Sequence, residues 1–327
     1  MRKLLFSVII VLLCAACSSL PKNRDIANPL KSQAEHLVNK AELFEKQQLY
    51  SNAKDYYVNA LDKYILIDEQ NRATLTKISI ARQLKKLNQE EEYKQLLEDI
   101  QYDLNMLQNK QVLKNEFTLL LIDDLYQKAE YDSLLLFSET IKDESDEQRL
   151  RKHSWQLLAM YSKKANHKAQ ISILSTQANK AMNNYMKKKF NDITAISFAF
   201  YSLGYVSYQK NNADGYKDAI KYFNKAYEAD RIDQNYNNLA ADLYYIGLSY
   251  YNLNEYEKAG WHLQRSANIY KQLLSQNKHD FAYFYSLISR YLTDNSPIYI
   301  EQIILLADNT YDEELKNIIQ KWLETNK

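Results

Sequence analysis

The stretch LYYIGLSYYNLNEYEKAGWHLQRSA, residues 243–267, decides the fold class of this chain. In its second half, the residues that follow one another at intervals of three, four and three are Tyr256, Ala259, Leu263 and Ser266. This spacing places side chains on one face of an α-helix. The first half is an apolar helical pattern that contains Gly247, and a short polar turn separates the halves. The stretch therefore predicts two helices that pack against each other.

The same spacing recurs at two other places in the chain. Its further copies are Tyr50, Ala53, Tyr57 and Ala60, and then Tyr216, Ala219, Phe223 and Ala226. Gly204 precedes the second of these copies much as Gly247 precedes the copy that begins at Tyr256. A glycine inside a helix costs about 1 kcal/mol relative to alanine, so its recurrence indicates a close helix contact that offsets this cost.

Residues that break helices are rare in this chain. Only four glycines and three prolines occur among its 327 residues, and Pro21 and Pro29 both lie near the N-terminus. Long apolar-periodic stretches must therefore be helical, and we expect an all-α fold. The 42 basic and 41 acidic side chains are interspersed along the chain. Because no basic stripe is present, the charge pattern does not indicate nucleic-acid binding.

These residues resemble the tetratricopeptide repeat (TPR). Its signature is Leu-Gly-x-x-Tyr in the first helix and Tyr-x-x-Ala-x-x-x-Phe-x-x-Ala in the second. Gly247 and Tyr250 match the first helix, and Tyr256 and Leu263 match the second. Residues 201–226 fit with a turn about three residues longer. The resemblance implies a solenoid of stacked helical hairpins, whose concave face usually binds peptides or partner proteins.

The repeat pattern divides the chain into segments. We expect degenerate TPR-like hairpins over residues 32–185, TPR repeats over 186–272 and C-terminal capping helices over 273–327. A long helix is expected to begin near Ser175 and to continue past KAMNNYMKKKF into the next unit. Pro297 predicts a helix start, because proline is favoured in the first turn. The expected architecture is a TPR-like helical-hairpin solenoid.

The N-terminal segment has the layout of a secretory signal peptide. Its apolar stretch, residues 4–13, is about half as long as the ~20 residues that a helix needs to cross a bilayer. Arg2 and Lys3 precede this stretch, and small residues follow it. A positive start, a short apolar centre and small residues together predict a segment that is removed from the mature protein.

The same segment resembles a bacterial lipoprotein signal. Cys17 follows the small residues and precedes a polar run, although Cys14 stands where that family usually has leucine. The resemblance implies that residues 1–16 are removed, that Cys17 carries lipid such as palmitate, and that residues 17–31 form a flexible tether. Two alternatives stay open for the cysteine pair. They are ordinary signal-peptide cleavage nearby, and a redox or metal pair, which would need a helix N-terminus or a second ligand pair.

The sequence contains no motif of a catalytic, metal or cofactor site. Its five histidines are scattered, without the spacing that would place two metal ligands on one helical face. Four glycines could not build phosphate-cradling loops of the usual kind, and no nucleophile elbow is present. We therefore expect no catalytic residues, no metal and no cofactor, and we predict that the chain is not an enzyme.

Some residues of the first helices are not needed for packing and would project onto the concave face. Tyrosine and asparagine suit partner contacts, because an aromatic ring offers area at little entropic cost and an amide adapts its hydrogen bonds. The candidate partner-binding residues are Tyr201, Tyr205, Tyr208, Asn237, Asn238, Tyr244, Tyr245 and Ser249. Packing within the hairpins is the alternative role for these tyrosines.

Three classes of function stay open. We favour a lipid-anchored TPR scaffold with protein or peptide partners, similar to the TPR lipoproteins of outer-membrane protein insertion, pilus biogenesis and peptidoglycan-enzyme regulation. The alternatives are a peptide- or solute-binding envelope receptor, which would need an enclosed pocket, and an envelope enzyme. Ser18 is not the aspartate that retains lipoproteins in the inner membrane of enteric bacteria. The resemblance therefore implies anchoring in the bacterial outer membrane, facing the periplasm.

Overall fold

The computed structural model describes residues 29–108, 110–142 and 145–326. The signal segment, Cys17 and most of the expected tether lie outside these residues. Within the described ranges the chain forms fifteen helices and no strand, as the scarcity of glycine and proline predicted. No helix in this part of the chain is long and apolar enough to cross a membrane.

The helices follow one another at short intervals. They are α2 (Pro29–Lys46), α3 (Tyr50–Leu66), α4 (Gln70–Lys86), α5 (Glu90–Met106), α6 (Gln111–Gln127), α7 (Tyr131–Ser138), α8 (Asp146–Ser162), α9 (Lys168–Met186), α10 (Ile193–Tyr208), α11 (Ala213–Asp233), α12 (Tyr236–Asn252), α13 (Tyr256–Gln272), α14 (Gln276–Asp294), α15 (Pro297–Asn309) and α16 (Glu313–Asn326). Consecutive helices pair into hairpins, beginning with α2 and α3 and ending with α14 and α15.

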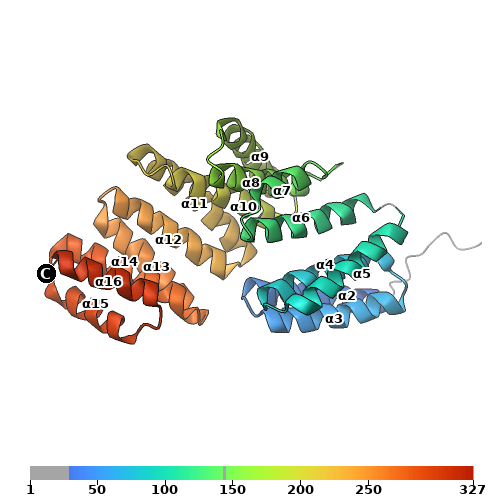
Figure 1. The fold of residues 1–327 in the computed structure, drawn as a ribbon, viewed down its shortest axis with the longest axis horizontal. Helices are drawn as coiled ribbons and strands as arrows, with labels where there is room; N and C mark the ends of the chain where they lie inside the picture. The colour runs from blue at the N-terminus through green and yellow to red at the C-terminus, as the bar shows by residue number, and fades with distance from the viewer. Residues whose placement is uncertain (1–28, 109, 143–144, 327) are drawn as a thin grey trace, which may run out of the picture.

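The hairpins stack along a curved path, with α2–α5 at one end and α14–α16 at the other (Figure 1). From α4 onward the first helix of each hairpin packs against the first helix of the next, and α16 packs against α14 and α15. Apolar residues on one face of α16, among them Ile319, cover the last hairpin. The expected all-α solenoid is thus confirmed, and α14–α16 form its C-terminal end.

The two helical glycines are contact points between the helices of their hairpins. A Cβ at Gly247 would lie 2.5 Å from Cγ of Leu263, and a Cβ at Gly204 would lie 2.9 Å from the ring of Phe223. Contacts this short leave no space for a methyl group. The close approach expected from the recurrence of glycine is therefore present in both α10–α11 and α12–α13.

The turns between helices use left-handed residues other than glycine. At Leu274, for example, φ is 54°, and the next amide, of Ser275, donates to the carbonyl of Tyr270 at 3.0 Å. This bond closes the end of α13 in the manner of a Schellman motif. The residues with positive φ are Gln48, Asp68, Asn88, Ala129, Lys164, Lys188, Asn211, Gln234, Asn254, Leu274 and Asn295. A solenoid with four glycines therefore forms its turns without them.

One expectation about helix extent is wrong. The helix that includes Ser175 begins earlier, at Lys168, and ends at Met186 instead of continuing into the next unit. Lys188 adopts φ of 56°, and the side chain of Asp192 accepts the amide of Ala195 at 2.9 Å to cap α10. Consecutive lysines offer no apolar stripe to bury, so the chain turns there.

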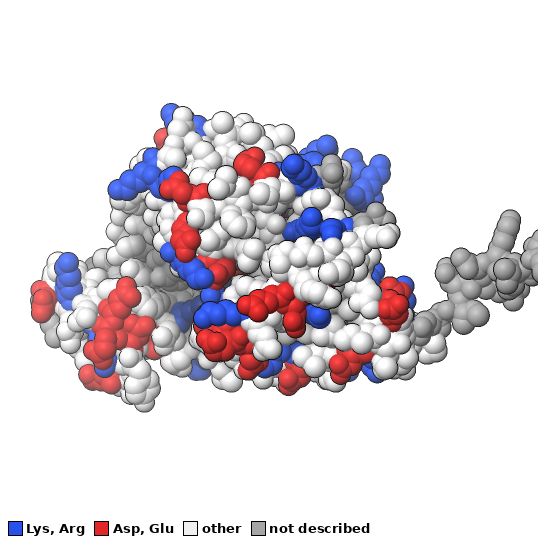
Figure 2. Space-filling model, turned by 45° about the vertical axis from the view of Figure 1, so that its right-hand side comes forward, with Lys and Arg blue, Asp and Glu red and all other residues white. Residues whose placement is uncertain are grey.

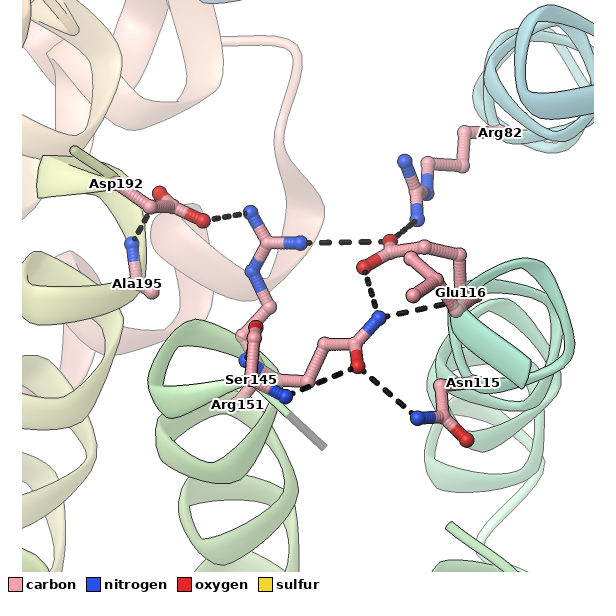
Figure 3. Close-up of polar contacts among 9 residues, drawn as sticks. Arg82, Asn115, Glu116, Ser145, Arg151, Asp192 and Ala195 are labelled. Atoms are coloured by element: carbon pink, nitrogen blue, oxygen red, sulfur yellow. Dashed lines mark hydrogen bonds and ion pairs between the residues drawn. The ribbon is translucent and has the colours of Figure 1, made fainter. Parts of the chain in front are cut away.

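A polar network joins the first helices of four hairpins, α4, α6, α8 and α10 (Figure 3). Arg82 of α4 donates to Oε2 of Glu116 in α6 at 3.0 Å. Arg151 of α8 donates to the same oxygen at 3.5 Å and to Asp192, which caps α10, at 2.5 Å. Gln148 adds a bond to Oε1 of Glu116 at 3.1 Å. One carboxylate thus receives donors from both neighbouring helices.

A further ion pair connects distant parts of the array. Nζ of Lys46, the last residue of α2, lies 2.6 Å from Oδ1 of Asp233 at the end of α11. The other oxygen of Asp233 accepts the hydroxyl of Thr194 at 2.9 Å. Asp233 is almost fully buried. The N-terminal hairpins are therefore held against the middle of the array by a charged contact.

Candidate functional site: an aromatic pocket between first helices

A pocket of about 620 Å³ lies where α10, α12 and α14 meet, with one residue each from α11 and α13. Its aromatic walls are Phe198, Tyr201, Tyr244, Tyr245, Tyr270 and Phe281. Its polar groups are Ser197, Asp230, Asn237, Asn238, Asn277 and Lys278. The volume falls in the range of pockets that hold a small ligand or part of a peptide.

Helix α12 forms the middle of the pocket because its sequence separates two faces. Asn238, Ala241 and Tyr245 follow one another at intervals of three and four residues and line the pocket. Leu239 and Leu243 lie on the opposite stripe and are buried between the hairpins. The helical period thus exposes amides and tyrosines on one side while the leucines hold the helix in place.

Tyr245 is the centre of the aromatic wall. Its ring stacks on Phe223 at a centroid distance of 5.1 Å and an interplanar angle of 9°. The rings of Tyr201 and Tyr244 meet it edge to face at 6.0 Å and 5.5 Å. Burial raises the pKa of the Tyr245 phenol to about 12, so the wall is uncharged at neutral pH. A wall of fixed, neutral rings offers contact area without a large loss of side-chain freedom.

The rim of the pocket carries amides and one cation. Lys278 at the start of α14 is exposed, and its Nζ donates to Oδ1 of Asn237 at 3.0 Å. The same ammonium lies over the ring of Tyr270, 5.5 Å from the centroid. Lys278 therefore already has a hydrogen-bond acceptor and an aromatic face.

Two carboxyl groups lie at the inner side of the pocket. Asp230 lines it and is 1% exposed, and its Oδ2 accepts the hydroxyl of Ser197 at 2.6 Å. Asp242 of α12 is fully buried, and among the described residues no donor reaches either of its oxygens. As a neutral acid, Asp242 can donate a hydrogen bond, and the acceptor of this bond is the carboxylate of Asp230.

The environment keeps both acids weak. Burial, and then the neighbouring charge of Asp230, raises the pKa of Asp242 well above its ordinary value. Burial also raises the pKa of Asp230, to about 7, although bonds from Ser197 and Asp242 act in the opposite direction. Two adjacent carboxyls titrate as a pair that holds on to a proton, so the inner side of the pocket carries no more than about one negative charge near neutral pH.

The structure brings five of the eight predicted partner-binding residues to this pocket. They are Tyr201, Asn237, Asn238, Tyr244 and Tyr245. Tyr205 and Tyr208 lie beside it, where their rings pack edge to face on Tyr245 at 5.9 Å and 5.5 Å. Ser249 is fully buried, and its hydroxyl donates to the carbonyl of Tyr245 one turn earlier at 2.7 Å. It lies in the core and does not line the pocket.

Sequence reasoning did not identify Asp230, Tyr270 and Lys278, because it looked for contacts only on α10 and α12. The sequence did contain a signal for the two buried acids, Asp230 and Asp242. Asp230 follows Phe223 by seven residues, which places it on the same buried stripe of α11. Asp242 likewise stands beside Leu243 within the apolar pattern of α12. Carboxylates at positions that the period buries are unusual, since they need partners there.

A second, charged cavity of about 730 Å³ lies between the N-terminal hairpins and α8, α10 and α11. Its basic residues Lys46, Arg82 and Arg151 are each paired with an acid. On the face seen in Figure 2, acidic and basic side chains also lie next to one another. The described residues contain no group of three or more His, Cys, Asp or Glu side chains arranged to hold a metal ion.

Two solved structures share this architecture. One is the signal transduction ATPase with numerous domains (STAND) protein with a tetratricopeptide repeat sensor, PH0952 from Pyrococcus horikoshii. Its TM-score is 0.60 and its identity 16%, and the match covers 86% of this chain and 42% of that one, less than half its length. The other is the apo form of RapI, with a TM-score of 0.58, 16% identity, and coverage of 88% and 79%.

At these identities the likeness shows the fold alone. The chain is an all-α, TPR-like helical solenoid, as the spacing of tyrosine, glycine and alanine predicted. No protein-family model matches the sequence, and no curated protein matches it.

Proposed function

We propose that this protein is a non-catalytic interaction scaffold that binds an extended segment of a partner protein in the pocket between α10, α12 and α14. The observation that carries the proposal is the lining of the pocket, which combines six aromatic side chains with the amides of Asn237, Asn238 and Asn277. Amides can bond to a peptide backbone of any sequence, while the rings hold its side chains.

The pocket belongs to a wider surface that suits a chain-like ligand. First helices that stack in a solenoid form a continuous inner face, and repeat proteins of this architecture use such faces for binding. The pocket favours a protein segment over a compact solute because the aromatic wall extends past it to Tyr205 and Tyr208.

Site-specific photocrosslinking tests this proposal. Asn277 lines the pocket and is exposed, so a photoreactive amino acid can replace it with little disturbance. Asn268 is exposed on α13 and is absent from the pocket lining, which makes it the matched control. We expect the probe at Asn277 to attach to one contiguous segment of one protein, and a synthetic peptide of that segment to compete. A co-purifying small molecule without a protein adduct would support the receptor alternative instead.

We further propose that the protein is lipid-anchored at Cys17 in the bacterial outer membrane and faces the periplasm, where its partners would be proteins of envelope assembly. The support is the N-terminal sequence, in which Cys17 follows small residues and precedes a polar run. Mass spectrometry of the membrane-extracted protein should show a lipidated N-terminus at Cys17. Cys17→Ser should release the protein from membranes, whereas Cys14→Ser should not, because Cys14 would be removed with the signal peptide. An unmodified N-terminus on the membrane-extracted protein would refute the anchor.

A further inference from the structure

The pocket contains a buried carboxyl group, that of Asp230, whose neighbouring donors are all uncharged: Ser197, Asn238 and the protonated Asp242. Asp230 is 1% exposed, and its Oδ2 accepts the Ser197 hydroxyl at 2.6 Å. Oδ1 has no hydrogen-bond partner among the described residues. A buried carboxylate oxygen without a donor is costly, since it has lost its water and gained nothing in return. When the acid pair gives up its proton, such an atom in a pocket wall is complementary to a ligand that supplies a donor.

Asp242 increases the complementarity of this part of the pocket to a positively charged ligand. It is fully buried beside Asp230, and neither of its oxygens receives a donor from the described part of the chain. Two acids in one apolar site can both ionise only if a cation joins them. The pair is therefore complementary to a basic group and would repel an acidic one.

The charged and titratable groups around Asp230 come from every helix of the pocket. They are Tyr201 of α10, Asp233 of its own helix, Asp242 of α12, Tyr270 of α13 and Lys278 of α14. Asp233 is already paired with Lys46. Lys278 is the one cation among them, but its ammonium is bonded to Asn237 and lies over Tyr270. No cation of the described chain forms an ion pair with Asp230.

The aromatic wall is suited to the same kind of ligand. Rings attract cations through their negative faces, and a guanidinium or ammonium stem packs well along them. Tyr201, Tyr244 and Tyr245 provide such rings within the pocket that Asp230 lines.

We propose that the segment bound in this pocket carries an arginine or lysine side chain, whose cation passes between the tyrosines and pairs with Asp230. This inference rests on the proposed function and specifies its ligand. The cation takes the place of the proton that Asp230 and Asp242 hold in the free protein, and this proton passes to the solvent. Binding is therefore coupled to pH and strengthens as the pair loses its proton.

Two peptide pools test the ligand class. Both consist of heptapeptides with neutral randomised positions and blocked ends, one with central arginine and the other with its neutral analogue citrulline. Immobilised protein should retain the arginine pool at least about tenfold better, because a buried charge pair is lost with citrulline. Asp230→Asn should abolish this preference. Asp218→Asn, on the same helix but exposed and paired with Lys210, is the matched control and should keep it.

The outcomes separate the two proposals. Equal retention of both pools would overturn the inference about the basic side chain and leave peptide binding intact. Failure to retain either pool would count against both. Circular dichroism of each variant establishes that a lost preference does not come from unfolding.

Calorimetry measures proton release on binding, which would not depend on Asp230 if this residue had only a structural role. Titration of a retained arginine peptide in two buffers of different ionisation enthalpy gives the number of protons released. Near about pH 6, where the raised pKa keeps Asp230 mostly protonated, we expect up to about one proton per peptide for the natural protein and none for Asp230→Asn. Binding of the arginine peptide without proton release would contradict the pairing with Asp230.

Discussion

The ring of Phe223 in α11 occupies the space that a side chain on Gly204 in α10 would need, with its Cδ1 and Cε1 atoms 2.9 Å from the position of a Cβ. The relationship repeats one hairpin later between Gly247 and Leu263. A large apolar residue of each second helix is thus packed directly on the backbone of the first. This contact sets how closely the two helices of a hairpin approach.

We expect Gly204→Ala to destabilise the protein by about 1–3 kcal/mol, because the added methyl group must displace a fully buried ring. Gly260→Ala is the control. The contacts there begin at 3.3 Å, to the flexible side chain of Arg290, so alanine should be tolerated and its higher helix propensity should add up to about 1 kcal/mol. Urea unfolding followed by circular dichroism measures both. Equal midpoints for the two variants would mean that the Phe223 contact does not limit the spacing.

The left-handed turns offer a change that should stabilise the protein. Leu274 has φ of 54° and is 90% exposed, so its side chain strains the backbone and contributes little to the core. Leu274→Gly should raise the free energy of unfolding by about 1 kcal/mol, because glycine adopts this conformation without a penalty. Leu273→Gly, at φ of −83°, should instead lower it. Thermal unfolding of the two variants distinguishes strain at the turn from a general effect of glycine.

The Glu116 network should make stability depend on acid. Burial acts to raise the pKa of Glu116, but Arg82 and Arg151 outweigh it and the pKa is lowered. A carboxyl with a lowered folded pKa contributes stability above its unfolded value of about 4.5 and loses it as the pH falls through the folded value. Glu116→Gln should cost about 1–3 kcal/mol at neutral pH, since both arginines are partly exposed.

The same variant should therefore lose less stability than the natural protein on acidification below about pH 4.5. Glu91→Gln is the control, because its ion pair with Lys94 is exposed. Parallel acid dependence in Glu116→Gln and the natural protein would exclude Glu116 as the responsible group.

Asp230 should make stability depend on pH in the direction opposite to that of Glu116. Its folded pKa of about 7 lies above the unfolded value of 3.8. The folded state keeps this proton to a higher pH than the unfolded state does, so the free energy of unfolding falls by on the order of a few kcal/mol as the pH rises from about 4 to about 7. Asp230→Asn should reduce this fall, although buried Asp242 retains a part of it, and should be more stable than the natural protein near about pH 8. Unfolding curves across this pH range measure it, and an unchanged slope in the variant would assign the effect elsewhere.

The sequence predicted the architecture because its signals are local. Gly247, Tyr256 and Leu263 fix which helix faces meet, and a solenoid needs little beyond such contacts between neighbours. Helix ends were harder to predict. The chain turns at Lys188, where a lysine adopts the left-handed conformation that glycine usually adopts, so the sequence contains no glycine to signal the end of α9.

The pocket could be predicted only in part, because some of its residues meet only when the hairpins stack. Asn238 and Tyr245 lie on the face of a first helix that the period leaves free, and they line the pocket. Asp230 belongs to a second helix and occupies a position that the period assigns to the core. Its proximity to Asp242 depends on how two hairpins stack, which a pattern within one helix does not contain.

The ion pair between Lys46 and Asp233 joins residues that are 187 positions apart. Extensive helix packing elsewhere in the described chain involves neighbours or next neighbours along the sequence. Contacts of such short range let folding start in any hairpin and spread outward quickly. We expect the Lys46–Asp233 contact to form after the hairpins that lie between these two residues, because closing so long a loop earlier carries an entropic cost. Breaking this one ion pair would therefore let the N-terminal hairpins move away from the end of α11 while every hairpin stays folded.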